Sequence, residues 1–386
     1  MDFDYSTEEL AFRDEVRHFL DENLPAPEQR DAQFRQQWLK KIREKRWVGF
    51  SWPKAVGGGG GSIMEQVILK AEMAARQAPA LGTSFMGLAW VGPGIIEYGS
   101  EAQKARFIPP ILASQVQWCT GYSEPGVGSD LAALQCRATR EDDFYIVNGQ
   151  KIWTTFGPFA DWIMMLVRTD ARSEVKHEGI TCLLVEMNSP GIEVRPIENM
   201  AGGKVFSEIF FDDVKVPIAQ RLGEEGKGWE VTISSLANER SSIGDVNAML
   251  ERLNELKVLL KKEKQGDEIL MTQPVVRQQL AYFEAKIEAM RLNGLRYLTK
   301  QIKGEPLSSE TSVNKLHRAS LEVEINDFAM ACLGARGLYK EQTPGVIDAG
   351  TWLEGSLNWP NVVIGGGTPN IQKNIIAERI LGLPKD

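Results

Sequence analysis

Residues 122–170 read YSEPGVGSDLAALQCRATREDDFYIVNGQKIWTTFGPFADWIMMLVRTD, and this stretch decides the fold. The turn from Glu124 to Asp130 is rich in glycine and proline, so it exposes backbone N–H groups and small hydroxyls that can bind a planar or phosphorylated ligand. On the strand that follows, Trp153 and Thr155 are two residues apart and are expected on the same face. An indole beside a hydroxyl suits a flat heteroaromatic ring, although a plain turn followed by a core aromatic explains the same residues.

The segments around this stretch follow a simple order. From Gln117 to about Val216 the chain is rich in β-branched and aromatic residues separated by turns, which predicts strands. Helical patterns lie near 30–46, 63–78, 100–114, 229–261, 273–303, 309–334 and 369–381. Helices, then strands, then helices predict an α+β protein with an N-terminal helical domain (1–115), a middle β-domain (116–220) and a C-terminal helical domain (221–386).

The composition limits the kinds of partner. The chain has 386 residues, 43% of them hydrophobic, and a formal net charge of -8, so we expect no nucleic-acid surface. No apolar run approaches membrane-spanning length, and we expect no membrane span. Four cysteines without a CxxC pair, beside only three histidines, predict no metal site. The acidic start, MDFDYSTEEL, is unlike a secretion signal, so we expect a cytoplasmic protein with free thiols.

A second unusual stretch, VIGGGTPNIQKNII, covers residues 363–376. Thr368 is placed to cap a helix whose first turn contains Pro369. The three glycines before it, with Gly366 at their centre, are consistent with a phosphate cradle, a hinge, or a gap where a reactive side chain would stand. Near the start of the chain, Ser6 and Glu9 form a capping box that predicts the beginning of the first helix.

A third stretch, SSLANERSSIGDV (residues 234–246), combines an apolar helical stripe with two charges. The stripe consists of Trp229, Ile233, Leu236, Ile243, Val246 and Leu250. Glu239 and Arg240 interrupt this stripe, and burying charge costs free energy unless the groups are partnered or lie in a solvated pocket. The pair is therefore a candidate catalytic site. Alternatively, it lies at the edge of the stripe and reaches water.

Taken together, these stretches resemble the acyl-CoA dehydrogenase family of flavoproteins. The likeness extends over nearly the whole chain and includes YGSEAQKARFIPPIL, the 122–170 stretch, FFDDVKVP with GEEGKGW, and IQKNIIAERILGLP. The resemblance implies an N-terminal helical domain, a middle β-domain and a C-terminal four-helix domain, usually assembled as a tetramer. It also implies FAD bound without a dinucleotide-fold glycine fingerprint.

The resemblance also implies roles for particular residues. Tyr122, Ser123 and Ser129 would line the flavin and its ribityl chain. Trp153 would cover the isoalloxazine, and Thr155 would bond near its N5/O4 edge. Gly366 and Thr368 would contribute to a cradle for flavin or substrate.

The family reaction makes a trans-2-enoyl-CoA from an acyl-CoA: a base removes the α proton while hydride passes from the β carbon to flavin N5. Many members place a glutamate before a Gly-Thr pair, where this chain has Gly366. Other members, similar to bacterial dehydrogenases of sterol side chains and other bulky acyl groups, carry the base on the first helix of the C-terminal domain, just before an arginine. The resemblance therefore implies Glu239 as the base, with Arg240 ordering the pocket.

The chain departs from the family pattern where neighbouring subunits complete the FAD site. KKEKQGDEILMTQP stands where an Arg-x-x-Phe-Gly stretch is usual, and Ala331 stands where a glutamine would fall. We therefore expect either a homotetramer or a heterotetramer with a second chain of this family, with little FAD held by the chain alone.

Three functions remain open at this point. The first is an acyl-CoA dehydrogenase that passes electrons to an electron-transfer flavoprotein and acts on a branched or bulky acyl group, such as a sterol side chain. The second is a non-catalytic or half-site subunit that supports an active partner. The third is an acyl-CoA oxidase, which differs mainly in access of oxygen.

Overall fold

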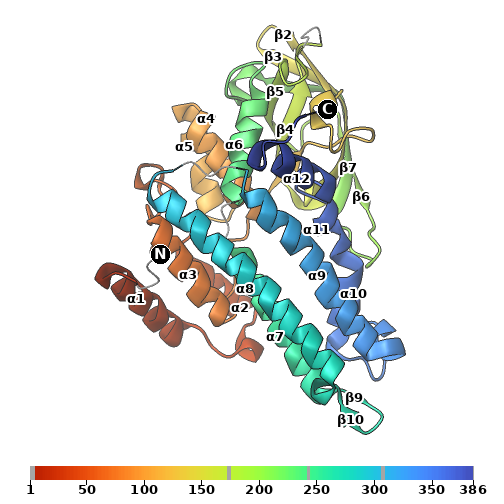
Figure 1. Cartoon of the computed structure of the whole chain (residues 1–386). Helices are drawn as coiled ribbons and strands as arrows, with labels where there is room; N and C mark the ends of the chain where they lie inside the picture. Colours follow the sequence, from red (N-terminus) through yellow and green to blue (C-terminus); the bar gives the residue numbers. More distant parts are fainter. Residues whose placement is uncertain (1–4, 172–174, 241–243, 306–308, 386) are drawn as a thin grey trace. The chain divides into compact units, whose positions relative to one another are not determined.

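The computed structural model describes residues 5–171, 175–240, 244–305 and 309–385, and within the helices it describes only the backbone of 236–240 and 244–245 (Figure 1). The chain divides into two compact units. The sheet unit comprises Glu22–Ser62 and Pro79–Glu239. The helical unit comprises Met1–Asp21, Ile63–Ala78 and Arg240–Asp386. The predicted order of helices, strands and helices is confirmed, whereas the three domain boundaries stay a prediction.

The sheet unit is built around an eight-stranded sheet in the order β6-β7-β3-β2-β4-β5-β8, with β1 paired to β4. Its helices are α2 (Ala32–Glu44), α4 (Gly92–Tyr98), α5 (Glu101–Leu112) and α6 (Gly228–Arg240). Its strands are β1 (Trp118–Gly121), β2 (Arg137–Glu141), β3 (Phe144–Thr155), β4 (Trp162–Arg168), β5 (Ile180–Glu186), β6 (Ile192–Ile197), β7 (Phe206–Pro217) and β8 (Arg221–Leu222). Most neighbours are antiparallel, as the short turns between strands require.

The centre of this sheet is buried on both faces. Along β4, Met164 and Leu166 belong to a hydrophobic core that includes side chains of α4 and α5. Ile163, Met165 and Val167 belong to a second core on the opposite face. Because successive side chains of a strand point to opposite faces, a strand covered on both sides needs an unbroken apolar run, and WIMMLVR provides it.

The helical unit packs long helices around its own core. Its elements are α1 (Thr7–Asn23), α3 (Ile63–Ala75), α7 (Gly244–Lys262), β9 (Lys264–Gln265), β10 (Glu268–Ile269), α8 (Pro274–Ile302), α9 (Thr311–Leu333), α10 (Thr351–Asn358), α11 (Pro360–Ile364) and α12 (Pro369–Ile375). In Figure 1, α7, α8 and α9 run side by side, and leucine and isoleucine side chains of all three share one core with Trp352 of α10. None of the described helices is long and apolar enough to cross a membrane.

The helix termini are set by the residues that the sequence indicated. The amide of Glu9 donates to the Ser6 hydroxyl, and the Glu9 carboxylate accepts from the amide of Ser6, which confirms the predicted capping box. Thr368 caps α12 by accepting from the amide of Ile371, and Pro369 is its first residue. The helical pattern at 229–261 is confirmed by α6 and α7, and residues 241–243 between them lie outside the described residues.

Candidate active site

The backbone of β3 is irregular at Trp153. Lys151 pairs with Ile209 of β7 and Thr154 pairs with Ser207, so the register shifts between them by a β-bulge. Trp153, inside the bulge, has a φ of 60° and a side chain that is 59% exposed. A bulky residue in the left-handed region is rare and strained, and such strain concentrates at functional sites. Bulges often redirect side chains next to active sites. The exposed indole therefore indicates that this end of the sheet is a candidate functional site.

The predicted partner of Trp153 lies on the same strand. Thr155 is half-buried and pairs with Phe206 of β7, and the Phe206 ring approaches the Trp153 ring edge-on with centroids 6.5 Å apart. The expectation that Trp153 and Thr155 share a face assumed an unbroken pleat. Because the bulge interrupts that pleat, the shared face stays a prediction.

Two further sequence-predicted residues run beside the same part of β3. The amide of Ile152 donates to the carbonyl of Ser123 at 2.9 Å, so Ser123 lies against the strand one residue before Trp153. Tyr122 is half-buried and packs against the core shared with α4 and α5. The structure therefore brings Tyr122, Ser123 and Trp153 together.

Ser129 lies on the exposed part of the loop that follows Ser123. A Cβ atom added at Gly126 or Gly128 would meet no atom within 4 Å, so the loop surface on both sides of Val127 is open. Open backbone next to a small hydroxyl fits a polar ligand chain, as the glycine-rich turn indicated.

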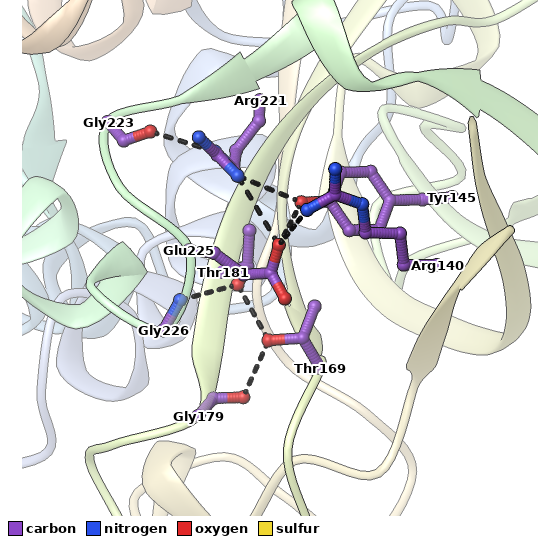
Figure 2. Close-up of polar contacts among 9 residues, drawn as sticks. All are labelled: Arg140, Tyr145, Thr169, Gly179, Thr181, Arg221, Gly223, Glu225 and Gly226. Carbon is purple, nitrogen blue, oxygen red and sulfur yellow. Dashed lines mark hydrogen bonds and ion pairs between the residues drawn. The ribbon is translucent and has the colours of Figure 1, made fainter. Parts of the chain in front are cut away.

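The beginning of α6 is attached firmly to the sheet (Figure 2). The Thr181 hydroxyl of β5 accepts from the amide of Gly226 at 2.9 Å and lies 2.7 Å from the Thr169 hydroxyl. Lys227 forms a parallel bridge with Ile180. These bonds fix the turn that leads into α6.

A charged cluster holds the same turn from the other side. Tyr145 donates its hydroxyl proton to Glu225 at 2.6 Å, and Arg221 approaches Glu225 at 3.3 Å (Figure 2). Arg140 lies 3.8 Å from the same carboxylate. Burial, followed by the hydrogen bond to Glu225, raises the pKa of Tyr145 above its ordinary value.

The buried face of α6 differs from the predicted apolar stripe. Ile233 is 54% exposed, whereas Val231, Thr232 and Ser235 are buried. The Thr232 hydroxyl donates to the carbonyl of Gly228, and the Ser235 hydroxyl donates to that of Val231. The stripe was wrong at Ile233 because it counted only apolar residues, while hydroxyls bonded within the helix can also be buried. Its members Leu236 and Ile243 lie outside the residues whose side chains are described.

Glu239 and Arg240 form the last turn of α6, and their side chains lie outside the described residues. Their catalytic roles are therefore not tested by the geometry. The helix itself packs against α4: a Cβ at Gly94 would lie 2.8 Å from the Ser235 hydroxyl oxygen, and Ser234 hydrogen-bonds to Glu97.

In the helical unit, the three-glycine stretch forms a loop before α12. Gly366 and Gly367 have φ values of 67° and 96°, which favour glycine. The buried Gln372 amide donates to the carbonyl of Gly366 at 3.0 Å, and its Oε1 atom has no hydrogen-bond partner within the described chain. Thr368, the capping residue, lies directly after this loop.

Sequence reasoning missed several of these residues. Three polar side chains are buried in the structure, and the sequence pattern gave no indication of their burial: Glu124, Lys151 and Gln372. Among the residues that the structure describes, no group of three or more His, Cys, Asp or Glu side chains is placed to hold a metal ion.

Comparisons with known proteins give one consistent result. Three family models match the chain: "Acyl-CoA dehydrogenase, N-terminal domain" at residues 6–115, "middle domain" at 119–214 and "C-terminal domain" at 226–381. Acyl-CoA dehydrogenase IpdE1 of Mycolicibacterium smegmatis is 33% identical, covering 97% of this chain and 98% of the relative. Acyl-CoA dehydrogenase FadE26 of Mycobacterium tuberculosis is 31% identical, and the match covers 100% of this chain and 99% of the relative.

Solved structures agree with the sequence relatives. A chain of the ChsE4-ChsE5 complex from Mycobacterium tuberculosis superposes with a TM-score of 0.85 at 32% identity, and all of both chains is covered. The Tcur3481-Tcur3483 steroid ACAD gives a TM-score of 0.84 at 30% identity, again over the full length of both chains.

Proposed function

The chain belongs to the acyl-CoA dehydrogenase family of FAD-dependent enzymes, and we propose that it oxidises a branched or bulky acyl-CoA thioester to the trans-2-enoyl-CoA. The observation that carries this proposal is the exposed Trp153, held in a strained backbone at a β-bulge within the segment that matches the middle domain. Strain of this kind concentrates at functional sites, and an exposed indole suits a flat cofactor ring.

The residues at this end of the sheet fit FAD. The exposed face of Trp153 is free to pack on the isoalloxazine, and the half-buried Thr155 hydroxyl follows it on β3. Ser123 and the open loop around Ser129 offer hydroxyl and backbone groups to the ribityl and phosphate part. FAD, when bound, supplies the hydride acceptor for the acyl β carbon.

In the helical unit, the loop at Gly366 presents a second set of polar groups. Gln372 is buried with one unpaired oxygen, and Thr368 caps the helix directly after the loop. We assign Gly366 and Thr368 to a cradle for the cofactor or for the thioester. Gly366 can donate a backbone N–H but cannot accept a proton, so the base must stand elsewhere.

We assign proton abstraction to Glu239. The support is the resemblance to family members that carry the base just before an arginine on this helix, which is α6 here. When bound substrate excludes water from a carboxylate, its pKa rises toward neutrality, which suits removal of a weakly acidic α proton. Arg240, next along the helix, would order the pocket.

The chemistry of the acyl group rests on two supports. The segment Gly87–Val91 forms a π-helical turn before α4, a geometry that recurs at functional sites, and Phe85 beside it is 56% exposed with its ring edge-on to Trp90. In addition, one of the solved structures that the chain resembles over its full length is described as a steroid ACAD. We therefore infer that the substrate carries a bulky acyl group, such as a sterol side chain.

The assembly is proposed as a tetramer, either of this chain alone or with a second chain of the family. Ala331 lacks the side-chain amide of a glutamine. The stretch that departs from the family pattern contains the hairpin of β9 and β10. The ChsE4-ChsE5 complex, which this chain resembles, is formed by two proteins. The electron acceptor that we propose is an electron-transfer flavoprotein.

Anaerobic addition of acyl-CoAs to the FAD-loaded protein tests the function. We expect sterol-derived or branched acyl-CoAs to bleach the flavin absorbance, with straight short chains slower. A protein that binds acyl-CoA without bleaching would instead be a half-site subunit, the alternative that Gly366 in place of a glutamate favours. Hydrogen peroxide formed in air at the rate of substrate consumption would identify an oxidase.

Purification of the chain alone and after co-expression with a second acyl-CoA dehydrogenase-like chain tests the assembly. We expect substoichiometric FAD in the lone chain and a full complement in the mixed complex. Tightly bound FAD at full occupancy in the lone chain would contradict the mixed assembly.

A further inference from the structure

A lysine is completely buried next to the bulge of β3. Lys151 has no exposed surface, and its Nζ atom lies 2.7 Å from Oε1 of Glu124, which is only 7% exposed. The same ammonium donates to the carbonyl of Tyr122 at 3.2 Å. A buried ammonium is retained only where such partners are provided, so these contacts are a fixed feature of the fold.

Glu124 uses its remaining hydrogen-bonding capacity to close a loop. Its Oε2 atom accepts from the amide of Gln135 at 2.6 Å, and its Oε1 atom accepts from the amide of Cys136 at 2.9 Å. Glu124 and Val127 exchange two backbone hydrogen bonds of 2.9 Å, which makes a tight turn at the start of the same loop. One carboxylate therefore joins the two ends of the segment 124–136, which carries Ser129.

The ion pair thus lies where two groups of candidate flavin residues meet. On one side is the 124–136 loop, together with Tyr122 and Ser123, which precede it. On the other side is β3, which departs from regular pairing directly after Lys151 and then presents Trp153 and Thr155. The Lys151–Glu124 pair connects the two groups through one ammonium and one carboxylate.

We propose that Lys151 is a positioning residue of the flavin site: through Glu124 it holds the 124–136 loop in a fixed place relative to Trp153. This inference rests on the proposed function, which assigns the flavin to these residues. Buried ion pairs add little net stability compared with apolar side chains of similar volume, whereas their directional bonds define one geometry. The function of the pair is therefore to order the loop before FAD binds, which lowers the entropy that binding must remove.

Three variants separate positioning from simple stability. Lys151→Met leaves the Glu124 carboxylate buried without its cation, and Glu124→Gln leaves the ammonium without its carboxylate. The double variant removes both charges of the pair. Lys176→Met is the control, because Lys176 pairs at 3.2 Å with Asp130 of the same loop and both side chains are exposed. Each protein is measured as apoprotein by urea unfolding and by hydrogen exchange at the amides of Gln135 and Cys136. FAD titration with flavin fluorescence then uses the same apoprotein, with its partner chain where one is needed to complete the site.

We expect Lys151→Met to unfold at lower urea and the double variant to recover most of that loss. In both, the FAD dissociation constant rises about tenfold or more, and the two loop amides exchange faster than in the wild type. Lys176→Met changes none of the three measurements. If the double variant binds FAD as tightly as the wild type, or if its loop amides remain protected, Lys151 has no positioning role.

These outcomes are independent of the proposed reaction, because FAD affinity is measured without acyl-CoA. Unchanged FAD affinity in the variants contradicts the positioning role and leaves the dehydrogenase function intact. Conversely, a wild type that binds FAD but is not bleached by any acyl-CoA contradicts the proposed function, while the ratio of dissociation constants still reports on Lys151. A wild type that binds no FAD even when its partner chain is present contradicts both.

Discussion

The hydroxyl of Thr181 accepts a hydrogen bond of 2.9 Å from the backbone amide of Gly226 (Figure 2). Thr181 lies on β5 with no exposed surface, and Gly226 belongs to the turn that begins α6 two residues later. A side chain of the sheet therefore fixes the start of the helix whose last turn contains Glu239.

Replacing Thr181 with valine removes the acceptor for the Gly226 amide and the bond to the Thr169 hydroxyl. We expect the free energy of unfolding to fall by about 1–3 kcal/mol, because a partly buried N–H group loses its partner. Urea denaturation measures the change. Thr272→Val, which removes an exposed hydroxyl, should alter stability by less than about 0.5 kcal/mol. Equal effects of the two substitutions would show that Thr181 does not anchor the turn.

Trp153→Gly and Trp153→Ala remove the same indole but differ in what the backbone tolerates. With a φ of 60°, alanine remains strained and glycine does not. We expect the glycine variant to be more stable than the alanine variant by about 1 kcal/mol in urea unfolding of the apoprotein. Both variants should lose FAD affinity to a similar degree. An alanine variant that is the more stable of the two would mean that the left-handed conformation at Trp153 is not strained.

Alanine at Gly366 and at Gly367 should have unequal effects. A Cβ at Gly366 would meet only the Lys315 side chain at 3.7 Å, so the substitution costs about 1 kcal/mol for its positive φ alone. A Cβ at Gly367 would lie 2.5 Å from the buried Gln372 amide nitrogen, which adds a steric conflict. In thermal unfolding, Gly367→Ala should therefore have a lower midpoint temperature than Gly366→Ala. The reverse order would show that Gln372 does not support this loop.

Because several thiols are buried, the free energy of unfolding should fall at alkaline pH. It raises the pKa of Cys136 from 9.0 to about 11 and that of Cys182 to about 12. Since the folded state holds these protons more tightly than the unfolded state, the stabilisation is complete below pH 9.0 and is lost as the pH rises through about 11. Urea unfolding of the wild type should show the free energy of unfolding falling with pH in this range. In Cys136→Ala, the free energy of unfolding should fall less steeply with pH. An identical slope in Cys136→Ala would contradict the raised pKa.

Much of the fold could be predicted from the sequence because local chemistry and tertiary packing agree. WIMMLVR predicts a strand and is one, since an apolar run of that length suits a strand covered on both faces. Ser6 and Thr368 cap the helices that they were expected to cap. The family was identified from motifs spread over the chain, and the comparisons confirm it.

What the sequence did not indicate depends on partners far along the chain. The stripe assigned to α6 failed at Ile233, because Thr232 and Ser235 satisfy their hydroxyls within the helix and occupy the buried side. No local pattern indicates that Lys151 is buried, and only the fold brings Glu124 beside it. The bulge at Trp153 follows from pairing with β7, which no local pattern encodes.

The central claim is that Glu239 removes the α proton, and Glu239→Gln measures it most directly. The FAD-loaded variant, with its partner chain where one is needed, is mixed anaerobically with an acyl-CoA that bleaches the wild type. Glu230→Gln, an exposed carboxylate on the same helix, is the control. The account predicts a rate of flavin reduction about a hundredfold to ten-thousandfold lower for Glu239→Gln, with FAD content unchanged and Glu230→Gln like the wild type. Flavin reduction at the wild-type rate in Glu239→Gln would contradict it.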